Sequence, residues 1–194
     1  APVFLDFKKD IQFGEFAPDI PVWYIRNTEN PTFNLEFVYD IGLENFKELP
    51  LAARYIKLLG TDKYSPEEIS NEFYRLGISY SINVSEDKTY ITISGLTENL
   101  PAGIDLVMHL LNNAKSNDTI YKNFINDLAK ERTDATKSMM YIISALVSYS
   151  LYGEDNPMMH TLSTKELSKM NPDDLLAYVK NLPKYSQKIY FYGD

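Results

Sequence analysis

The sequence predicts an α+β fold, a mostly antiparallel sheet with helices packed on one face, and three observations support this. Segments with an apolar residue at every second position, as in half-buried strands, occur in pairs. Segments with apolar residues at helical spacing also occur in pairs, and they separate the strand pairs. The connections are short and contain no low-complexity tract, so we expect residues 1–194 to form a single domain.

The first part of the chain predicts two or three strands. In residues 22–26, Val22, Tyr24 and Arg26 alternate with Trp23 and Ile25, which is typical of a short strand. Over residues 33–41 apolar side chains occupy every second position, the pattern of a half-buried strand. The intervening residues 27–31, Asn-Thr-Glu-Asn-Pro, have the composition of a turn. Gln12 and Phe13 are candidates for an additional short strand before these two.

After these strands, the spacing of apolar residues changes from every second position to that of a helix. Residues 51–59 have apolar side chains at helical spacing, and Gly60 follows them as a C-terminal cap would. A second helix is indicated by Ser65, Pro66 and Glu68. The serine can cap the helix, proline suits the first helical position, and glutamate three residues after serine completes a capping box.

A further strand pair, several helices and a last strand are predicted for the rest of the chain. Apolar spacing predicts a strand pair at residues 78–84 and 91–93, a helix from Pro101, a long helical region over 119–152 broken near Thr133, short helices at 163–170 and 173–180, and a last strand at 188–192. Within the long region, the segment Met139–Tyr152 is the most apolar, with Ile142, Ile143, Leu146 and Val147. We expect it to be the most buried helix, so aspartate at Leu146 should unfold the domain.

Composition excludes several classes of function. The chain has no cysteine, which removes disulfides, thiolate metal sites and cysteine nucleophiles, and its two histidines cannot form a three-histidine metal site. A net charge of −8 argues against nucleic acid as a partner, because phosphate binding requires clustered Lys and Arg. No stretch approaches the ~18 apolar residues that a membrane span needs.

The residue types that carry chemistry are widely spaced. His109 and His160 have no short-spaced ligand partner, so we expect a solvated helix histidine and an ordinary loop histidine. Asp127 and Glu131 are four residues apart on a helix, with basic residues between them, which favours a solvated ion-pair face over acid–base catalysis. No glycine-rich phosphate loop and no G-x-S-x-G motif is present.

The last strand has an aromatic face, because Tyr190 and Tyr192 alternate with Phe191. Core packing is the expected role of this face. A surface that contacts peptide is the alternative.

Five segments of the chain together resemble the insulinase-like (pitrilysin-type) zinc metallopeptidases. These are residues 20–27, 37–42, 51–53, 59–68 and 94–99, so the resemblance extends over essentially the whole chain. The motif H-x-x-E-H of this family is missing. In the register set by Leu51 and Ala52, its positions hold Ala53, Ile56 and Lys57, none of which can bind Zn²⁺ or take a proton from zinc-bound water. The resemblance places the third ligand of the family, a glutamate, in the region of Glu131.

The resemblance implies a domain of the zinc-free C-terminal half of such a peptidase, excised from a longer multidomain protein. It implies a chain that holds no cofactor and is itself inactive, while the catalytic half of the same polypeptide carries the zinc. Such a domain helps to enclose the substrate chamber and contacts peptide, most plausibly at strand edges. The cell envelope or periplasm is the compartment that the resemblance favours.

Two other functions are compatible with the same residues. The first is a structural scaffold subunit of a larger complex without proteolytic activity. The second is an enzyme with an unrecognised site, which would be marked by a self-contained pocket with strongly perturbed acids.

Overall fold

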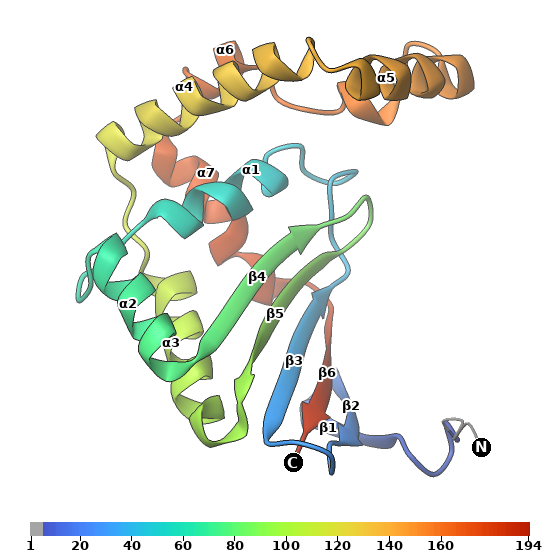
Figure 1. Cartoon of the computed structure of the whole chain (residues 1–194), viewed down its shortest axis with the longest axis vertical. Coiled ribbons are helices and arrows are strands. Elements are labelled where there is room, and N and C mark those ends of the chain that lie inside the picture. The colour runs from blue at the N-terminus through green and yellow to red at the C-terminus, as the bar shows by residue number, and fades with distance from the viewer. Residues whose placement is uncertain (1–5) are drawn as a thin grey trace.

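The structure, a computed structural model, describes residues 6–194 and contains one six-stranded sheet within that part (Figure 1). The strands are β1 (Gln12–Ala17), β2 (Ile20–Arg26), β3 (Thr32–Tyr39), β4 (Ile78–Val84), β5 (Thr89–Leu96) and β6 (Gln187–Gly193). Their order in the sheet is β1-β2-β6-β3-β5-β4, and all neighbours are antiparallel except β2 and β6. The predicted α+β class with a mostly antiparallel sheet is confirmed.

Helices cover one face of this sheet (Figure 1). They are α1 (Leu49–Tyr55), α2 (Pro66–Leu76), α3 (Leu100–Asn113), α4 (Asp118–Ala135), α5 (Met139–Tyr152), α6 (Thr164–Leu167) and α7 (Pro172–Lys180). Of these, α1, α2, α3 and α7 lie against the sheet, whereas α4 and α5 run past one end of it. The opposite sheet face carries no helix among the described residues.

The start of α2 forms as its sequence predicts. Ser65 accepts a hydrogen bond from the Glu68 amide, and the Glu68 carboxylate accepts one from the Ser65 amide, which lowers the pKa of that carboxyl. Pro66 occupies the first turn, and Gly77 ends the helix with a φ of 60°, a conformation that glycine adopts without strain.

One helix boundary differs from its prediction. The first helix leaves α geometry at Tyr55 and continues as a 3-10 turn, Ile56–Leu58, so Gly60 lies beyond an extended Leu59 and does not cap it. The long helical region breaks after Ala135, near Thr133 as predicted, and Ser138 caps the start of α5 through its hydroxyl.

The hydrophobic core lies between the sheet and its helix layer. Ile93 of β5, Leu110 of α3 and Leu176 of α7 are among its fully enclosed side chains. Tyr55 is also buried, and its hydroxyl donates to the Asn117 carbonyl and accepts from the Asn117 amide, at 3.2 and 3.1 Å. This phenol therefore joins α1 to the cap of α4.

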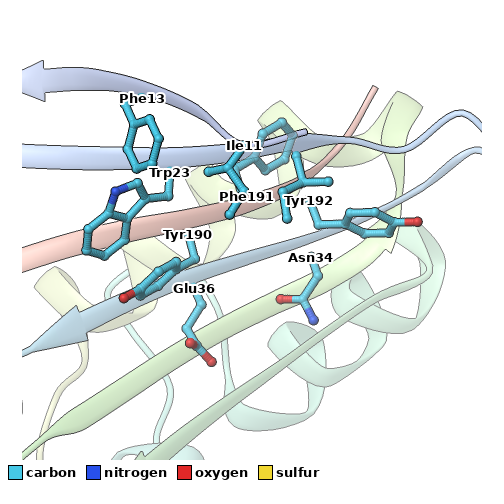
Figure 2. Close-up of a pocket in the computed structure, with 9 residues that line it drawn as sticks. Ile11, Phe13, Trp23, Asn34, Glu36, Tyr190, Phe191 and Tyr192 are labelled. Carbon is cyan, nitrogen blue, oxygen red and sulfur yellow. The ribbon is translucent and has the colours of Figure 1, made fainter. Parts of the chain in front are cut away.

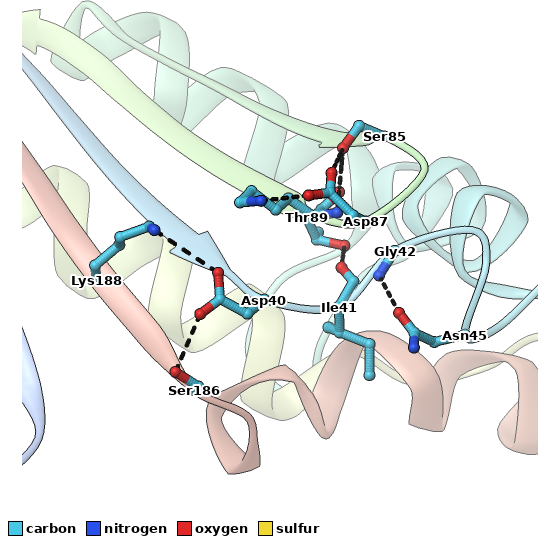
Figure 3. Close-up of polar contacts among 10 residues, drawn as sticks. Asp40, Ile41, Gly42, Asn45, Ser85, Asp87, Thr89, Ser186 and Lys188 are labelled. Atoms are coloured by element: carbon cyan, nitrogen blue, oxygen red, sulfur yellow. Dashed lines mark hydrogen bonds and ion pairs between the residues drawn. The ribbon is translucent and has the colours of Figure 1, made fainter.

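The turn that follows β3 is held by polar contacts to two neighbouring strands (Figure 3). The buried Thr89 hydroxyl donates to the Ile41 carbonyl at 2.8 Å, and the Ser186 hydroxyl donates to Asp40 at 3.1 Å. At Gly42, a Cβ would lie 2.5 Å from the Ser85 carbonyl oxygen, so only glycine fits there. The path of the chain from the sheet to α1 is thereby fixed.

The expected burial of α5 is wrong. None of its residues is buried. The exposed fraction of its large apolar side chains ranges from 41% at Tyr141 to 72% at Met140. Leu146, the position chosen for aspartate, is 64% exposed. The helix packs chiefly against the short 3-10 turn Pro157–Met159 rather than against the sheet, so its hydrophobic residues meet no core of this chain.

Candidate functional site

The three positions assigned to the degenerate motif do not face a common site. Ala53 and Ile56 are buried in the core beneath α1, whereas Lys57 is exposed. Neither Ala53 nor Ile56 borders any of the cavities that the structure shows near α1.

The face of α1 that meets α4 carries a different pair of residues, Pro50 and Arg54. The Arg54 guanidinium donates through Nη2 to both carboxylate oxygens of Glu131, each at 2.8 Å. Pro50, Arg54 and Glu131 border one cavity of about 510 Å³, which also reaches Tyr141 of α5. Arg54 additionally lies 5.8 Å from the centre of the Phe124 ring. Glu131 was expected on a solvated face with ion pairs along its own helix. In the structure it forms an ion pair with Arg54 of α1.

This pair was not predictable from local sequence pattern, because its two members are 77 residues apart. The cavity around it is lined by three basic residues, Lys47, Arg54 and Arg132, and by Glu131. Among residues 6–194, no group of three histidine, aspartate or glutamate side chains is placed to hold a metal ion.

The two histidines occupy separate polar environments. His109 is half-buried rather than solvated as expected, since its Nε2 lies 2.9 Å from the Thr61 hydroxyl and 3.7 Å from Asp62. His160 lies in a loop as predicted, with its Nε2 2.7 Å from the exposed Asp155 carboxylate. Each histidine therefore has a structural partner of its own.

The carboxyl groups with shifted pKa values all shift downwards. Helix caps lower the pKa of Glu68 and Glu166, and hydrogen bonds from basic neighbours lower those of Glu72 and Asp87. A general acid at neutral pH needs the opposite shift, produced by burial. These four carboxyls are structural, and they do not support the reading of an enzyme with an unrecognised acid.

The helix-free face of the sheet carries an aromatic row over β1, β2 and β6 (Figure 2). The Phe13 and Trp23 rings meet edge to face at 6.4 Å, and the Trp23 and Tyr190 rings are 4.6 Å apart. Register places Glu36 of β3 opposite Tyr190, so the row ends at a carboxylate. A hollow of about 460 Å³ lies over these side chains.

Core packing was the expected role of Tyr190 and Tyr192, and the structure corrects it. Their side chains lie on the helix-free face and remain 39% and 40% exposed, because no helix of the described chain covers them. Phe191 points to the opposite side of the strand and packs against the core. The alternative, a contact surface, is the role that this geometry supports.

The sheet has two edge strands. β1 forms one edge, and five of its six residues are exposed. β4 forms the other edge. An edge strand presents unpaired amide and carbonyl groups to which an extended peptide can add.

Comparison with protein-family models and with curated proteins finds no match. Comparison with solved structures finds many. The ferredoxin protease FusC, in a mutant form bound to Arabidopsis ferredoxin, matches 100% of this chain with a TM-score of 0.80 and 18% identity. The periplasmic protease PqqL from Escherichia coli matches 96% of the chain, with a TM-score of 0.77 and 15% identity. A peptidase M16 inactive domain from Pseudomonas fluorescens matches 95%, with a TM-score of 0.77 and 16% identity.

The chain spans only part of each of these proteins. It corresponds to 22% of FusC, 21% of PqqL and 46% of the Pseudomonas fluorescens chain. In each case nearly all of the present chain is matched, so the likeness concerns the complete arrangement of sheet and helices. The resemblance to insulinase-like peptidases is confirmed at the level of structure, and this chain has the fold of a domain of M16 peptidases, the insulinase-like family.

Proposed function

We propose that this chain is a non-catalytic domain of an insulinase-like zinc metallopeptidase, part of the zinc-free half of a longer protein. The observation that carries the proposal is the pairing of Arg54 with Glu131 on the face of α1 that meets α4. A guanidinium neutralises the one carboxylate that the resemblance offers as a zinc ligand. The guanidinium donates hydrogen bonds to both oxygens of that carboxylate, so Glu131 pairs with an arginine side chain, which takes no part in catalysis.

The same contact favours a different register for the lost motif. The two histidines of H-x-x-E-H are four residues apart and bind one ion together with the distant glutamate. Pro50 and Arg54 have this spacing and border the same cavity as Glu131, whereas neither Ala53 nor Lys57 borders it. A register with Pro50, Ala53 and Arg54 therefore fits Glu131 better than the register with Ala53, Ile56 and Lys57. In either register the metal ligands are absent.

A supporting role in substrate handling is the positive part of the proposal. The exposed edge β1 and the aromatic face beside it give an extended peptide both main-chain partners and apolar contacts. This domain and the catalytic half of the same polypeptide, which would hold the zinc, would together enclose the substrate chamber. The likeness to a periplasmic protease supports the cell envelope as the compartment.

Zinc titration of three proteins tests the proposal. The natural chain should bind no stoichiometric Zn²⁺ by calorimetry or by metal analysis. The double variant Pro50→His/Arg54→His frees Glu131 and supplies two imidazoles four residues apart, so it should acquire one zinc site. The matched control, Ala53→His/Lys57→His, should not acquire a site shared with Glu131.

Each outcome decides a separate point. One zinc ion bound per natural chain would refute the non-catalytic assignment. Zinc binding by the Ala53→His/Lys57→His variant but not by the other would restore the original register. A scaffold subunit is the second candidate, and the parent gene distinguishes it: an H-x-x-E-H motif encoded upstream supports the peptidase, and its absence supports the scaffold.

A further inference from the structure

The cavity of about 510 Å³ between α1 and α4 differs in charge from the chain as a whole. Three basic side chains, Lys47, Arg54 and Arg132, and one acidic side chain, Glu131, border it, so its lining has a net charge of +2. The whole chain has a net charge of −8. A local excess of positive charge within a cavity attracts an anion and repels a metal ion.

Two of these three cations have no carboxylate partner in the described part of the chain. Arg54 pairs with Glu131, whereas the ion pairs within residues 6–194 include neither Lys47 nor Arg132. Arg132 is half-buried, so its guanidinium loses contacts with water without gaining a carboxylate. A guanidinium of this kind at the border of a cavity is well suited to bind the carboxylate of a ligand.

The carboxylate of Glu166, which feels the charge of Lys47, is already used in a helix cap. Hydrogen bonds from the hydroxyl and the amide of Ser163 lower the pKa of Glu166, and the positive charge of Lys47 adds to this effect. The same hydrogen bonds complete the capping box at the start of α6. Glu166 is therefore held at α6, and the ammonium group of Lys47 remains available to a ligand.

Most of the remaining cavity wall is apolar. Its apolar residues include Leu43, Leu51, Val84, Leu128, Ala135 and Met158. Leu51 and Leu128 also belong to the buried core, so this part of the wall is firmly held. A free phosphate or sulfate ion would leave the wall without contacts. The wall and the cations together fit a ligand that carries one anionic group next to an apolar group.

The C-terminal residue of a peptide has this chemistry, because its carboxylate and its side chain are attached to the same carbon atom. An acidic side chain within a peptide is a poorer fit, since the peptide would have to both enter and leave the cavity. The cavity is bounded by α1, by α4, by the first turn of α5 and by Met158 and Thr161, so a chain end is accommodated more readily. The choice of a peptide as the ligand rests on the proposed function.

We propose that this cavity binds the C-terminal carboxylate of a peptide whose last side chain is apolar. Arg132 and Lys47 bind the carboxylate, and the last side chain packs on the apolar wall. Arg54 is a positioning residue: it neutralises Glu131, whose charge would otherwise repel the carboxylate of the ligand.

Fluorescence anisotropy with labelled peptides tests the proposal on the whole chain. The probe is Gly-Ser-Gly-Ser-Leu with fluorescein at its N-terminus, prepared with a free C-terminal carboxylate and as the C-terminal amide. The carboxylate form should bind about tenfold or more tightly than the amide, and replacing its last leucine by serine should weaken binding several-fold. Equal affinities in either comparison would overturn the proposal, as would the lack of saturable binding of the carboxylate form up to ~1 mM. Equally tight binding of an amide that carries an internal aspartate would also overturn it, since the site would then recognise an acidic side chain.

Two variants of α4 locate the binding within the chain. Arg132→Gln should weaken binding of the carboxylate peptide by about tenfold and leave binding of the amide unchanged. The matched control is Lys130→Gln, which removes one positive charge from an exposed position of the same helix that does not border the cavity. It should leave both affinities unchanged. Natural affinity in Arg132→Gln, or an equal loss in both variants, would show that the carboxylate binds elsewhere.

A rescue experiment separates the role of Arg54 from support of the fold. Arg54→Met leaves Glu131 charged and unpaired, so it should weaken binding of the carboxylate peptide, and the further change Glu131→Gln should restore it. Glu131→Gln alone should strengthen binding, a gain that lost packing would not produce. Weak binding in the double variant would refute the positioning role of Arg54.

The peptide measurements and the zinc titration fail independently of each other. A natural chain that binds neither Zn²⁺ nor the carboxylate peptide would keep the non-catalytic assignment and overturn this inference. A natural chain that binds one zinc ion and still selects the carboxylate over the amide would refute the assignment and keep the site.

Discussion

Truncating one leucine in α5 and one in the core gives the sharpest test of where the stability of this domain resides. Leu146 and Leu176 are both leucines within helices, but they are 64% and 1% exposed. Replacing either by alanine removes the same three carbon atoms and keeps a strong helix former. Any difference between the two variants therefore measures packing rather than propensity.

The magnitudes follow from the exposed fractions. Full burial of three methylene-sized groups is worth about 2.4 kcal/mol, and the cavity left in a rigid core raises the cost of Leu176→Ala to about 2–5 kcal/mol. Leu146 has only about a third of its surface covered, so the same arithmetic gives roughly 0.8 kcal/mol for Leu146→Ala, with no enclosed cavity.

Urea unfolding followed by far-ultraviolet circular dichroism would measure both values. The expected result is a free energy of unfolding that falls several times more for Leu176→Ala than for Leu146→Ala. Equal losses would mean that α5 packs on the domain in solution, which would refute the burial pattern and with it the vacant surface of α5.

Three further predictions concern single features of the fold. Gly42→Ala should lower the free energy of unfolding by about 1–3 kcal/mol, because the new Cβ overlaps a backbone carbonyl, and a urea midpoint equal to that of the natural chain would contradict the close approach. Burial raises the pKa of Tyr39 and Tyr80 to about 12, so the native state holds their protons more tightly than the unfolded chain; stability should be constant below about pH 10 and fall between about pH 10 and 12, and ultraviolet tyrosine titration that finds both groups ionising near pH 10 would exclude this. A double-mutant cycle with Arg54→Met and Glu131→Gln should give a coupling energy of only about 0.2–1 kcal/mol, since both side chains are half-exposed, and a coupling several times larger would mean a desolvated pair.

Local patterns in the sequence predicted most elements of the fold. The capping box of Ser65 and Glu68, the alternation in β3 and the hairpin of β4 and β5 depend on neighbours within a few residues, and all three appear as expected. The position of β6 between β2 and β3 could not be predicted in this way. Strand order depends on contacts between distant segments, which leave no periodic signal in either one.

Burial was predicted less well than secondary structure, for a physical reason. The apolar composition of a helix indicates that burying its surface is favourable, but it does not identify the molecule against which the helix packs. For this reason the sequence predicts that Leu146 and Tyr190 lie in the core of the domain, whereas both side chains are exposed in the structure. The pair of Arg54 and Glu131 is not evident from the sequence, because Glu131 has basic neighbours on its own helix that account for it locally and Arg54 is 77 residues away.

The placement of β6 has a consequence for the order in which the domain folds. The last segment of the chain lies between the hairpin of β1 and β2 and the rest of the sheet, and it is the strand through which that hairpin is attached. During synthesis, β3, β4 and β5 can pair early, whereas β1 and β2 have no place in the sheet until residues 187–193 emerge. Closure of so long a loop slows folding. A chain truncated before Gln187 should therefore release β1 and β2 to protease, while β3, β4 and β5 keep their amide protection in hydrogen exchange. Pairing of β6 thus completes the sheet, and Phe13 and Trp23 of β1 and β2 reach their final positions only after this step.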